Sequence, residues 1–280
     1  MELEPDIAAH YRLGVERDRL TTWGRLEAER TRELLDRYLP SPPATVLDVG
    51  GAEGAYALPL ALNGYVVHLV DPVSAHIDAA RSASSAQPAH PLASVELGDA
   101  RHLEAADSSV DAVLMLGPLY HLIEATDRGR ALAEAFRVLR PGGVLFAAGI
   151  SRFASTLDGL RTGDIADARF EDIVSGDLLH GRHSNPDVEG HPEWFTLAYF
   201  HRPDELLDEV RSAGFPGAEL FAVEGAGAWL DLNDSLDDPS RRASILAAIR
   251  RVEREPSLLG SSPHVMVIAT KPNTVQLRSQ

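Results

Sequence analysis

The chain has 280 residues, of which 44% are hydrophobic and none is cysteine, and its formal net charge at pH 7 is −16. The lack of cysteine excludes disulfides, thiolate metal sites and a cysteine nucleophile, and the acidic balance disfavours nucleic acid, whose phosphate backbone it would repel. No stretch approaches the roughly 20 apolar residues of a membrane span, and the acidic N-terminus does not resemble a signal peptide. We therefore expect a cytoplasmic protein with no membrane partner.

The first predicted element is a charged helical segment at residues 1–40. Thr21 or Thr22 is expected to cap a helix that ends before Pro40. The apolar face of this helix is expected to carry four residues: Trp23, Leu26, Leu34 and Tyr38.

Strands and helices alternate after the proline-rich linker at residues 40–43. Five short apolar strands are predicted, at 46–49, 64–71, 93–97, 110–116 and 144–148. Helices are predicted among them, at 55–62, 74–82 and 128–139. Near-continuous apolar strands that alternate with helices predict an α/β fold with a parallel sheet covered on both faces.

The alternation breaks at residues 151–202, where no strand is predicted and His, Asp, Gly and aromatic residues are frequent. Such a long irregular stretch is typical of a lid or a binding insertion. Regular elements return as a helix at 203–213, a strand at 218–223, a helix at 240–253 and a strand at 264–270. We therefore divide the chain into an N-terminal helical cover, the two halves of one sheet domain, an insertion and a tail: 1–40, 41–150 with 203–273, 151–202 and 274–280.

The stretch Asp48–Gly54 joins the first strand to the next helix through a glycine-rich turn. Glycines let a ligand approach the backbone, and the free N–H groups of a first helical turn point toward it, so this corner suits a nucleotide-sized ligand. Its spacing is Gly-x-Ala-x-Gly, whereas a dinucleotide site has Gly-x-Gly-x-x-Gly. The turn could hold a dinucleotide or S-adenosylmethionine, and the spacing counts against the dinucleotide. A tight turn without a ligand is the plain alternative.

Two more carboxylates stand at strand ends, where ligands of open parallel sheets bind. Asp71 can accept hydrogens from both ribose hydroxyls of a nucleoside, and Asp99 can accept those of an adenine amino group. Each has an alternative role, Asp71 as a helix cap and Asp99 as a turn residue. Together with Asp48 they predict a nucleoside site at one edge of the sheet.

The order of these motifs resembles class I S-adenosylmethionine-dependent methyltransferases, and it includes the later runs Leu116–Leu122 and Leu139–Gly143. The resemblance implies a seven-stranded, mostly parallel, doubly wound sheet whose last strand is antiparallel. It implies S-adenosylmethionine as cofactor and S-adenosylhomocysteine as product. The residues it implies at the cofactor are Tyr11, Asp48, Gly50, Gly51, Ala52, Asp71, Pro72, Asp99, Ala100, Arg101, Leu116, Gly117, Tyr120 and His121. One departure is Ala52, where many members of the family have glycine.

The end of the fourth strand indicates the class of acceptor. Enzymes that methylate amide or adenine amino groups usually carry Asn/Asp-Pro-Pro-aromatic there, but this chain has Leu116–Leu119. The positions at which catechol-type enzymes bind magnesium carry no carboxylates here, so no metal is expected. The Gly-Pro-Leu-Tyr-His-Leu run at 117–122 is similar to a bacterial group of small-molecule methyltransferases. We expect a small molecule, for instance a secondary metabolite, that is methylated on O, N or C.

The insertion contributes the candidate catalytic histidines. A methyl acceptor must present a lone pair, often after it loses a proton, and histidine suits that task. Catalytic roles are expected for His183, Tyr199 and His201 of the insertion and for His121 after the fourth strand. Acceptor contacts are expected for Arg152, Asn185, Trp194, Phe195 and Tyr199. In the alternative interpretation His201 caps the next helix and the aromatic residues only pack the insertion. A metal site around His180 and His183 is disfavoured, because the spacing matches no ligand pattern.

The leading hypothesis is thus a small-molecule methyltransferase that uses histidine-assisted deprotonation. The alternatives are a nicotinamide-dependent oxidoreductase and a methyltransferase-like fold with a binding or non-methyl-transfer role. Tyr11, Arg19 and Trp23 of the N-terminal segment either close over the cofactor, contribute to a homodimer contact or belong to a solvated charged helix.

Overall fold

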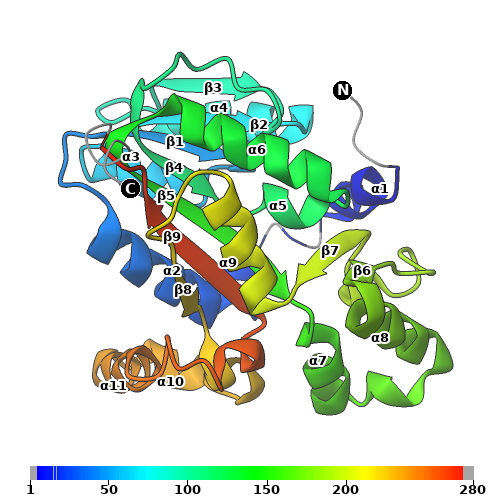
Figure 1. The fold of residues 1–280 in the computed structure, drawn as a ribbon. Coiled ribbons are helices and arrows are strands. Elements are labelled where there is room, and N and C mark those ends of the chain that lie inside the picture. Colours follow the sequence, from blue (N-terminus) through cyan, green and yellow to red (C-terminus); the bar gives the residue numbers. More distant parts are fainter. Residues whose placement is uncertain (1–4, 15, 17, 274–280) are drawn as a thin grey trace.

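A mixed nine-stranded β-sheet is the centre of the molecule (Figure 1). The computed structural model describes residues 5–14, 16 and 18–273, so the predicted tail at 274–280 lies outside the described residues. Seven strands run side by side in the order β3-β2-β1-β4-β5-β9-β8. Their bounds are Thr45–Val49 (β1), Val66–Asp71 (β2), Ser94–Leu97 (β3), Val110–Met115 (β4), Leu139–Ser151 (β5), Glu219–Ala222 (β8) and His264–Thr270 (β9).

Strand β9 is antiparallel to both of its neighbours, β5 and β8. The predicted antiparallel last strand is confirmed, and its predicted bounds are those of the structure. Because the other six strands are mutually parallel, the first residue of β9 lies at the edge of the sheet where those strands end. His264 is that residue, and it pairs with Ile150 near the end of β5.

The two faces of the sheet form separate cores, since alternate residues of a strand point to opposite faces. Val46 of β1 packs on one face with helices α2 (Arg25–Tyr38), α3 (Ala57–Leu62) and α4 (Ser74–Ala86). Leu47 packs on the other face with α6 (Ala125–Val138) and α9 (Pro203–Ser212), which lie in front of the sheet in Figure 1. The prediction of a sheet covered on both faces is confirmed.

The N-terminal segment differs in detail from its prediction. Helix α1 (Pro5–Leu13) and a short 3₁₀ turn, η1 (Arg19–Thr21), precede α2, which begins after Gly24. Thr21 and Thr22 each donate their hydroxyl hydrogen to the carbonyl of Asp18 and cap no α-helix, so that prediction is wrong. Trp23 lies before the helix with 65% of its surface exposed, whereas Leu26 and Leu34 are buried as predicted.

The segment 151–202 is more regular than predicted. It contains helices α7 (Ala154–Thr162) and α8 (Ala168–His180), which stand together beyond the end of β5 in Figure 1. It also contains two short paired strands, β6 (Arg182–His183) and β7 (Ala198–His201), so the prediction that it holds no strand is wrong. Strand β7 continues the sheet by pairing with the last two residues of β5. These two strands raise the strand number from the predicted seven to nine.

The remaining elements surround the edge of the sheet or pack on the C-terminal half. They are α5 (Pro118–His121), α10 (Asn233–Asp237), α11 (Pro239–Arg250) and the short turns η2 (Asp164–Ala166), η3 (Pro192–Trp194), η4 (Gly225–Trp229) and η5 (Leu259–Ser261). None of the described helices combines the length and apolar character that a bilayer crossing demands.

Candidate active site

A cavity of about 2240 Å³ lies along the edge where the parallel strands end. One end is lined by Asp71 and Asp99, which close β2 and follow β3, and the other end is lined by His264 of β9. Residues from α1, such as Tyr11, and from the insertion, such as Phe195, also line it. The cavity therefore joins the predicted cofactor residues to segments distant in sequence.

The glycine turn after β1 requires backbone that favours glycine. Gly50 and Gly54 have φ values of 72° and 93°, and a Cβ on Gly50 would lie 2.9 Å from Pro118. Ala52 also adopts a left-handed conformation, with φ of 48°, which costs an L-residue about 1 kcal/mol or more. This is a physical reason for the glycine that many methyltransferases carry at the position of Ala52.

Asp48 lies beneath this turn and is 2% exposed. Burial, and then the neighbouring charge of Asp71, raise the pKa of the Asp48 carboxyl to about 7. Its Oδ2 has no hydrogen-bond partner within the described part of the chain, and a Cβ on Gly51 would approach that oxygen to 2.7 Å. An unpartnered buried oxygen beside a glycine that leaves room for it suits an N–H or cationic group of a ligand.

Asp71 fixes the glycine turn to the start of α4. Its Oδ2 accepts the N–H of Ala52 at 2.9 Å, and its Oδ1 accepts the N–H of Val73 at 2.9 Å and a contact from His76 Nδ1 at 3.0 Å. His76 also lines the cavity, and the sequence did not indicate it. A carboxylate held at the edge in this way has a defined orientation toward a ligand.

Asp99 and Arg101 form a second polar corner. The Asp99 carboxylate accepts the backbone N–H of Arg101 at 2.8 Å and its guanidinium at 3.0 Å. Burial opposes ionisation of Asp99, but the hydrogen bonds from Arg101 outweigh it and lower the pKa of this carboxyl. Arg101 in turn binds Asp127 of α6. Asp99 is thus an ionised acceptor at neutral pH.

Helix α1 closes over this end of the cavity. The hydroxyl of Tyr11 lies 2.7 Å from Nε2 of His121, and its ring meets the edge of His76 at 5.3 Å. Burial lowers the pKa of His121 to about 4, so this imidazole is neutral at pH 7. All fourteen predicted cofactor residues line the cavity, from Tyr11 to His121.

The insertion residues predicted for catalysis divide into two groups. His183, Trp194 and Phe195 line the cavity, whereas Arg152, Asn185, Tyr199 and His201 do not. Phe195 has a φ of 66° and directs its ring toward His10, Tyr120 and His121, with centroid distances of 5.3, 6.3 and 5.8 Å.

His183 is held by acceptors at both ring nitrogens. Its Nδ1 lies 3.1 Å from the carboxylate of Asp177, and its Nε2 lies 2.7 Å from the carbonyl oxygen of Trp194. Since a carboxylate and a carbonyl oxygen are both acceptors, each ring nitrogen of His183 is already engaged by a group of the protein. Its ring is also stacked on Phe200 at 4.4 Å. This geometry suits a buried structural histidine better than a general base.

The residues outside the cavity have structural partners. The Asn185 amide donates to the carbonyls of His191 and Phe195, and its oxygen accepts the N–H of Asp187. His201 is fully buried, and its Nε2 lies 3.4 Å from Glu209. Arg152 and Tyr199 are joined to each other and to Glu205.

The comparisons with known proteins bear on the cofactor half of this site. Residues 47–147 match the family model of a methyltransferase domain. This methyltransferase match covers the glycine turn, Asp71, Asp99 and the end of β4.

Relatives of the chain carry methyltransferase names. An uncharacterized methyltransferase of Mycobacterium tuberculosis is 37% identical over 113 residues, which are 40% of this chain and 42% of the relative. A ubiquinone/menaquinone biosynthesis C-methyltransferase of Acidiphilium cryptum is 35% identical over 122 residues, 43% of this chain and 48% of the relative. The matched region thus spans less than half the length of these curated relatives.

Solved methyltransferases share the fold over most of the chain. A SAM-dependent methyltransferase of Methanosarcina mazei superposes with a TM-score of 0.56 at 20% identity, covering 85% of this chain and 97% of its own. A possible histamine N-methyltransferase of Thermotoga maritima gives 0.56 at 20% identity over 93% and 97%. Both superpositions show that the chain shares its fold with solved SAM-dependent methyltransferases.

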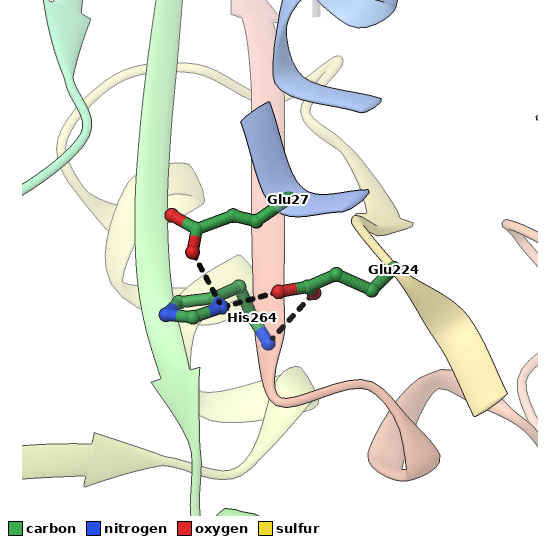
Figure 2. Close-up of side chains that lie close together, drawn as sticks. All are labelled: Glu27, Glu224 and His264. Carbon is green, nitrogen blue, oxygen red and sulfur yellow. Dashed lines mark hydrogen bonds and ion pairs between the residues drawn. The ribbon is translucent and has the colours of Figure 1, made fainter. Parts of the chain in front are cut away.

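At the other end of the cavity lies a cluster that sequence reasoning missed. Glu27 of α2, Glu224 after β8 and His264 of β9 converge there, as Figure 2 shows. His264 Nδ1 lies 2.6 Å from Oε1 of Glu224 and 3.7 Å from Oε2 of Glu27. The available signal was the predicted antiparallel strand at 264–270, whose first residue had to lie at the ligand edge.

Proposed function

We propose that this chain is an S-adenosylmethionine-dependent methyltransferase that acts on a small molecule. The observation that carries the proposal is the placement of Asp48, Asp71 and Asp99 around one cavity with the glycine turn, within the region that matches a methyltransferase domain. The cofactor would supply an activated methyl group. A nicotinamide cofactor is disfavoured, because the turn lacks the dinucleotide spacing.

The residues of this chain would hold the cofactor by complementary hydrogen bonds. The unpartnered Oδ2 of Asp48 would accept an N–H or cationic group, while Asp71 would accept ribose hydroxyls and Asp99 the adenine amino group. Tyr11 and Phe195, from segments far apart in sequence, would exclude water from the same space.

The acceptor would occupy the part of the cavity toward β5 and β9. Along the sheet edge β9 lies three strand spacings from β1, or about 14 Å at roughly 4.8 Å per spacing. Ile150 and Met266 give this part apolar walls, and the Glu27–Glu224–His264 cluster gives it polar groups. Rate enhancement would come mainly from positioning the acceptor in line with the methyl group and from excluding water.

The proposal also includes the removal of a proton from the acceptor by a histidine. Of the catalytic candidates, His121 and His183 line the cavity. His121 is neutral, and although its Nε2 contacts the Tyr11 hydroxyl, its buried Nδ1 has no hydrogen-bond partner in the described part of the chain, whereas both nitrogens of His183 contact protein acceptors. His121 is therefore the preferred base among them, although a pKa of about 4 makes it a weak one.

The first test is isothermal titration of the full chain with S-adenosylhomocysteine. We expect binding, and we expect Asp71→Ala to weaken it more than about tenfold, because a hydrogen bond to a charged group contributes about 1.5–3 kcal/mol. Circular dichroism melting would show whether the variant is folded. Asp78→Ala, an exposed carboxylate on α4, is the matched control and should bind as the wild type does. Wild-type protein without measurable binding would refute the proposed function.

A further inference from the structure

The Glu27–Glu224–His264 cluster is placed where an acceptor would meet the protein. All three residues, with Arg19, line the cavity. His264 stands at the edge of the sheet because β9 is antiparallel, and it pairs in register with Ile150 of β5. The cluster thus lies on the acceptor side of the proposed site, away from the glycine turn.

The two ring nitrogens of His264 have different environments. Nδ1 faces the carboxylates of Glu224 and Glu27, and the backbone N–H of His264 donates to Glu224 Oε2 at 3.2 Å. Figure 2 shows the other ring nitrogen, Nε2, on the side of the ring turned away from Glu224, with no interaction drawn to it. No hydrogen bond to Nε2 occurs among the residues that the structure describes. The cluster therefore fixes the ring and leaves one nitrogen for a ligand.

The charges in the cluster are already paired with protein cations and donors. Arg19 binds Glu27 through both terminal guanidinium nitrogens, one of them at 3.0 Å, and it also binds Glu16 at 2.8 Å. Ser262 donates to Glu224 Oε2 at 3.1 Å. A divalent cation would have to displace these partners, so the cluster is better described as an ion-pair network than as a metal cage.

His264 carries a positive charge at neutral pH. Burial alone would lower the pKa of its imidazole, but the carboxylates of Glu27 and Glu224 outweigh burial and the opposing charge of Arg19, and they raise the pKa to about 9. With Nδ1–H directed at the carboxylates, Nε2–H is a charged hydrogen-bond donor.

We propose that His264 is an acceptor-binding residue that donates from Nε2 to an anionic oxygen of the acceptor: a carboxylate, phenolate or enolate. The inference rests on the proposed function and specifies its substrate class. An oxygen anion keeps lone pairs for reaction when it accepts this hydrogen bond. An amine has one lone pair, which the bond would occupy, and an ammonium ion would be repelled by His264. Apolar neighbours such as Met266 and Trp229 suit an apolar body attached to that oxygen.

The test uses the full chain saturated with S-adenosylhomocysteine and three probes of similar shape: benzoate, benzyl alcohol and benzylamine. We expect benzoate to bind best, and His264→Gln to weaken benzoate binding by about tenfold or more. His90→Gln, in an exposed loop, is the matched control and should bind benzoate as the wild type does.

A second readout follows the His264 ring by nitrogen-15 NMR. Benzoate should shift the Nε2 resonance, and Glu224→Gln should lower the pKa of His264 and move the loss of benzoate binding to lower pH. The inference is overturned if benzylamine binds more tightly than benzoate, if His264→Gln leaves benzoate binding unchanged, or if saturating benzoate does not shift Nε2. Failure of S-adenosylhomocysteine itself to bind would instead refute the proposed function, so the two failures are distinguishable.

Discussion

The glycine turn and the insertion both bury polar side chains, but they differ in whether those side chains have hydrogen-bond partners. In the insertion, His183 has an acceptor at each ring nitrogen, and Asn185 uses its whole amide to hold the loop at 185–195. At the turn, Asp48 keeps a buried oxygen without a partner in the described residues. Satisfied polar groups stabilise a fold, whereas unsatisfied ones lower stability unless a ligand completes them. Residue type alone does not distinguish the two cases.

The largest expected effect tests the insertion. His183→Ala should lower the free energy of unfolding by about 3 kcal/mol, because it removes a buried ring that contacts the Asp177 carboxylate and the Trp194 carbonyl and stacks on Phe200. Binding of S-adenosylhomocysteine should remain within about twofold, since the contacts of His183 are with Asp177, Trp194 and Phe200 and not with Asp48 or Asp71. Urea unfolding and isothermal titration measure the two quantities.

His180→Ala is the matched control for that experiment. His180 is exposed on the same helix, α8, and contacts the carbonyl of Gly176, so its removal should change stability by well under 1 kcal/mol. A His183→Ala protein as stable as the wild type would show that the buried pair is not structural. His183 would then again be a candidate for the general base.

A smaller effect is expected at the turn, with the opposite sign. Asp48→Asn should stabilise the ligand-free protein by about 2 kcal/mol above pH 7, because it removes a buried carboxylate whose ionisation is opposed by burial and by Asp71. This is about half of the roughly 4 kcal/mol to which a rise of about three pKa units corresponds, because the folded protein can relax around the ionised group. The same change should weaken binding of S-adenosylhomocysteine. Stability and affinity would thus move in opposite directions at this one position.

The stability difference between the wild type and Asp48→Asn should depend on pH. The folded pKa of Asp48, about 7, lies above the value of an unfolded aspartate, so the folded state binds the proton more tightly. The wild type therefore loses stability as the pH rises from about 4 to about 7, and the difference from Asp48→Asn should grow over that range and then level off. Thermal melts at pH 4.5, 6 and 8 would measure it, and a pH-independent difference would contradict the assignment.

The smallest effect concerns the backbone of the turn. Ala52→Gly should stabilise the protein by up to about 1 kcal/mol, because glycine adopts the left-handed φ of 48° without steric cost. Ala243→Gly, at an exposed position inside α11, is the control and should destabilise by about 1 kcal/mol. If both variants destabilised the protein, the left-handed backbone at Ala52 would not be strained.

The sequence predicted the parts of the fold that depend on local pattern. Apolar strands and their terminal carboxylates, Asp71 and Asp99, were located because strand ends of a parallel sheet share one edge. The helices α7 and α8 were missed, because the insertion lacks the strong period that marked the other helices. Histidines such as His183 were misleading for a related reason: their partners, Asp177 and Trp194, become visible only in the tertiary structure.

The position of His264 in the cavity could have been predicted from the same strand pattern. The antiparallel strand at 264–270 was predicted with its observed bounds. It was not predicted that the first residue of this strand, His264, lies at the ligand edge. Glu27 and Glu224 come from helical and post-strand segments almost 200 residues apart, and no spacing rule joins them to His264. Their convergence is a property of the folded chain.

The placement of β9 also bears on the order in which the molecule is completed during synthesis. This strand pairs along seven residues of β5 on one side and with β8 on the other, yet it follows every other strand in the chain. Until it leaves the ribosome, β5 and β8 each present an unpaired edge, and contacts this distant in sequence form slowly. A stalled or truncated chain that lacks residues 264–270 would expose both edges and would be prone to aggregation.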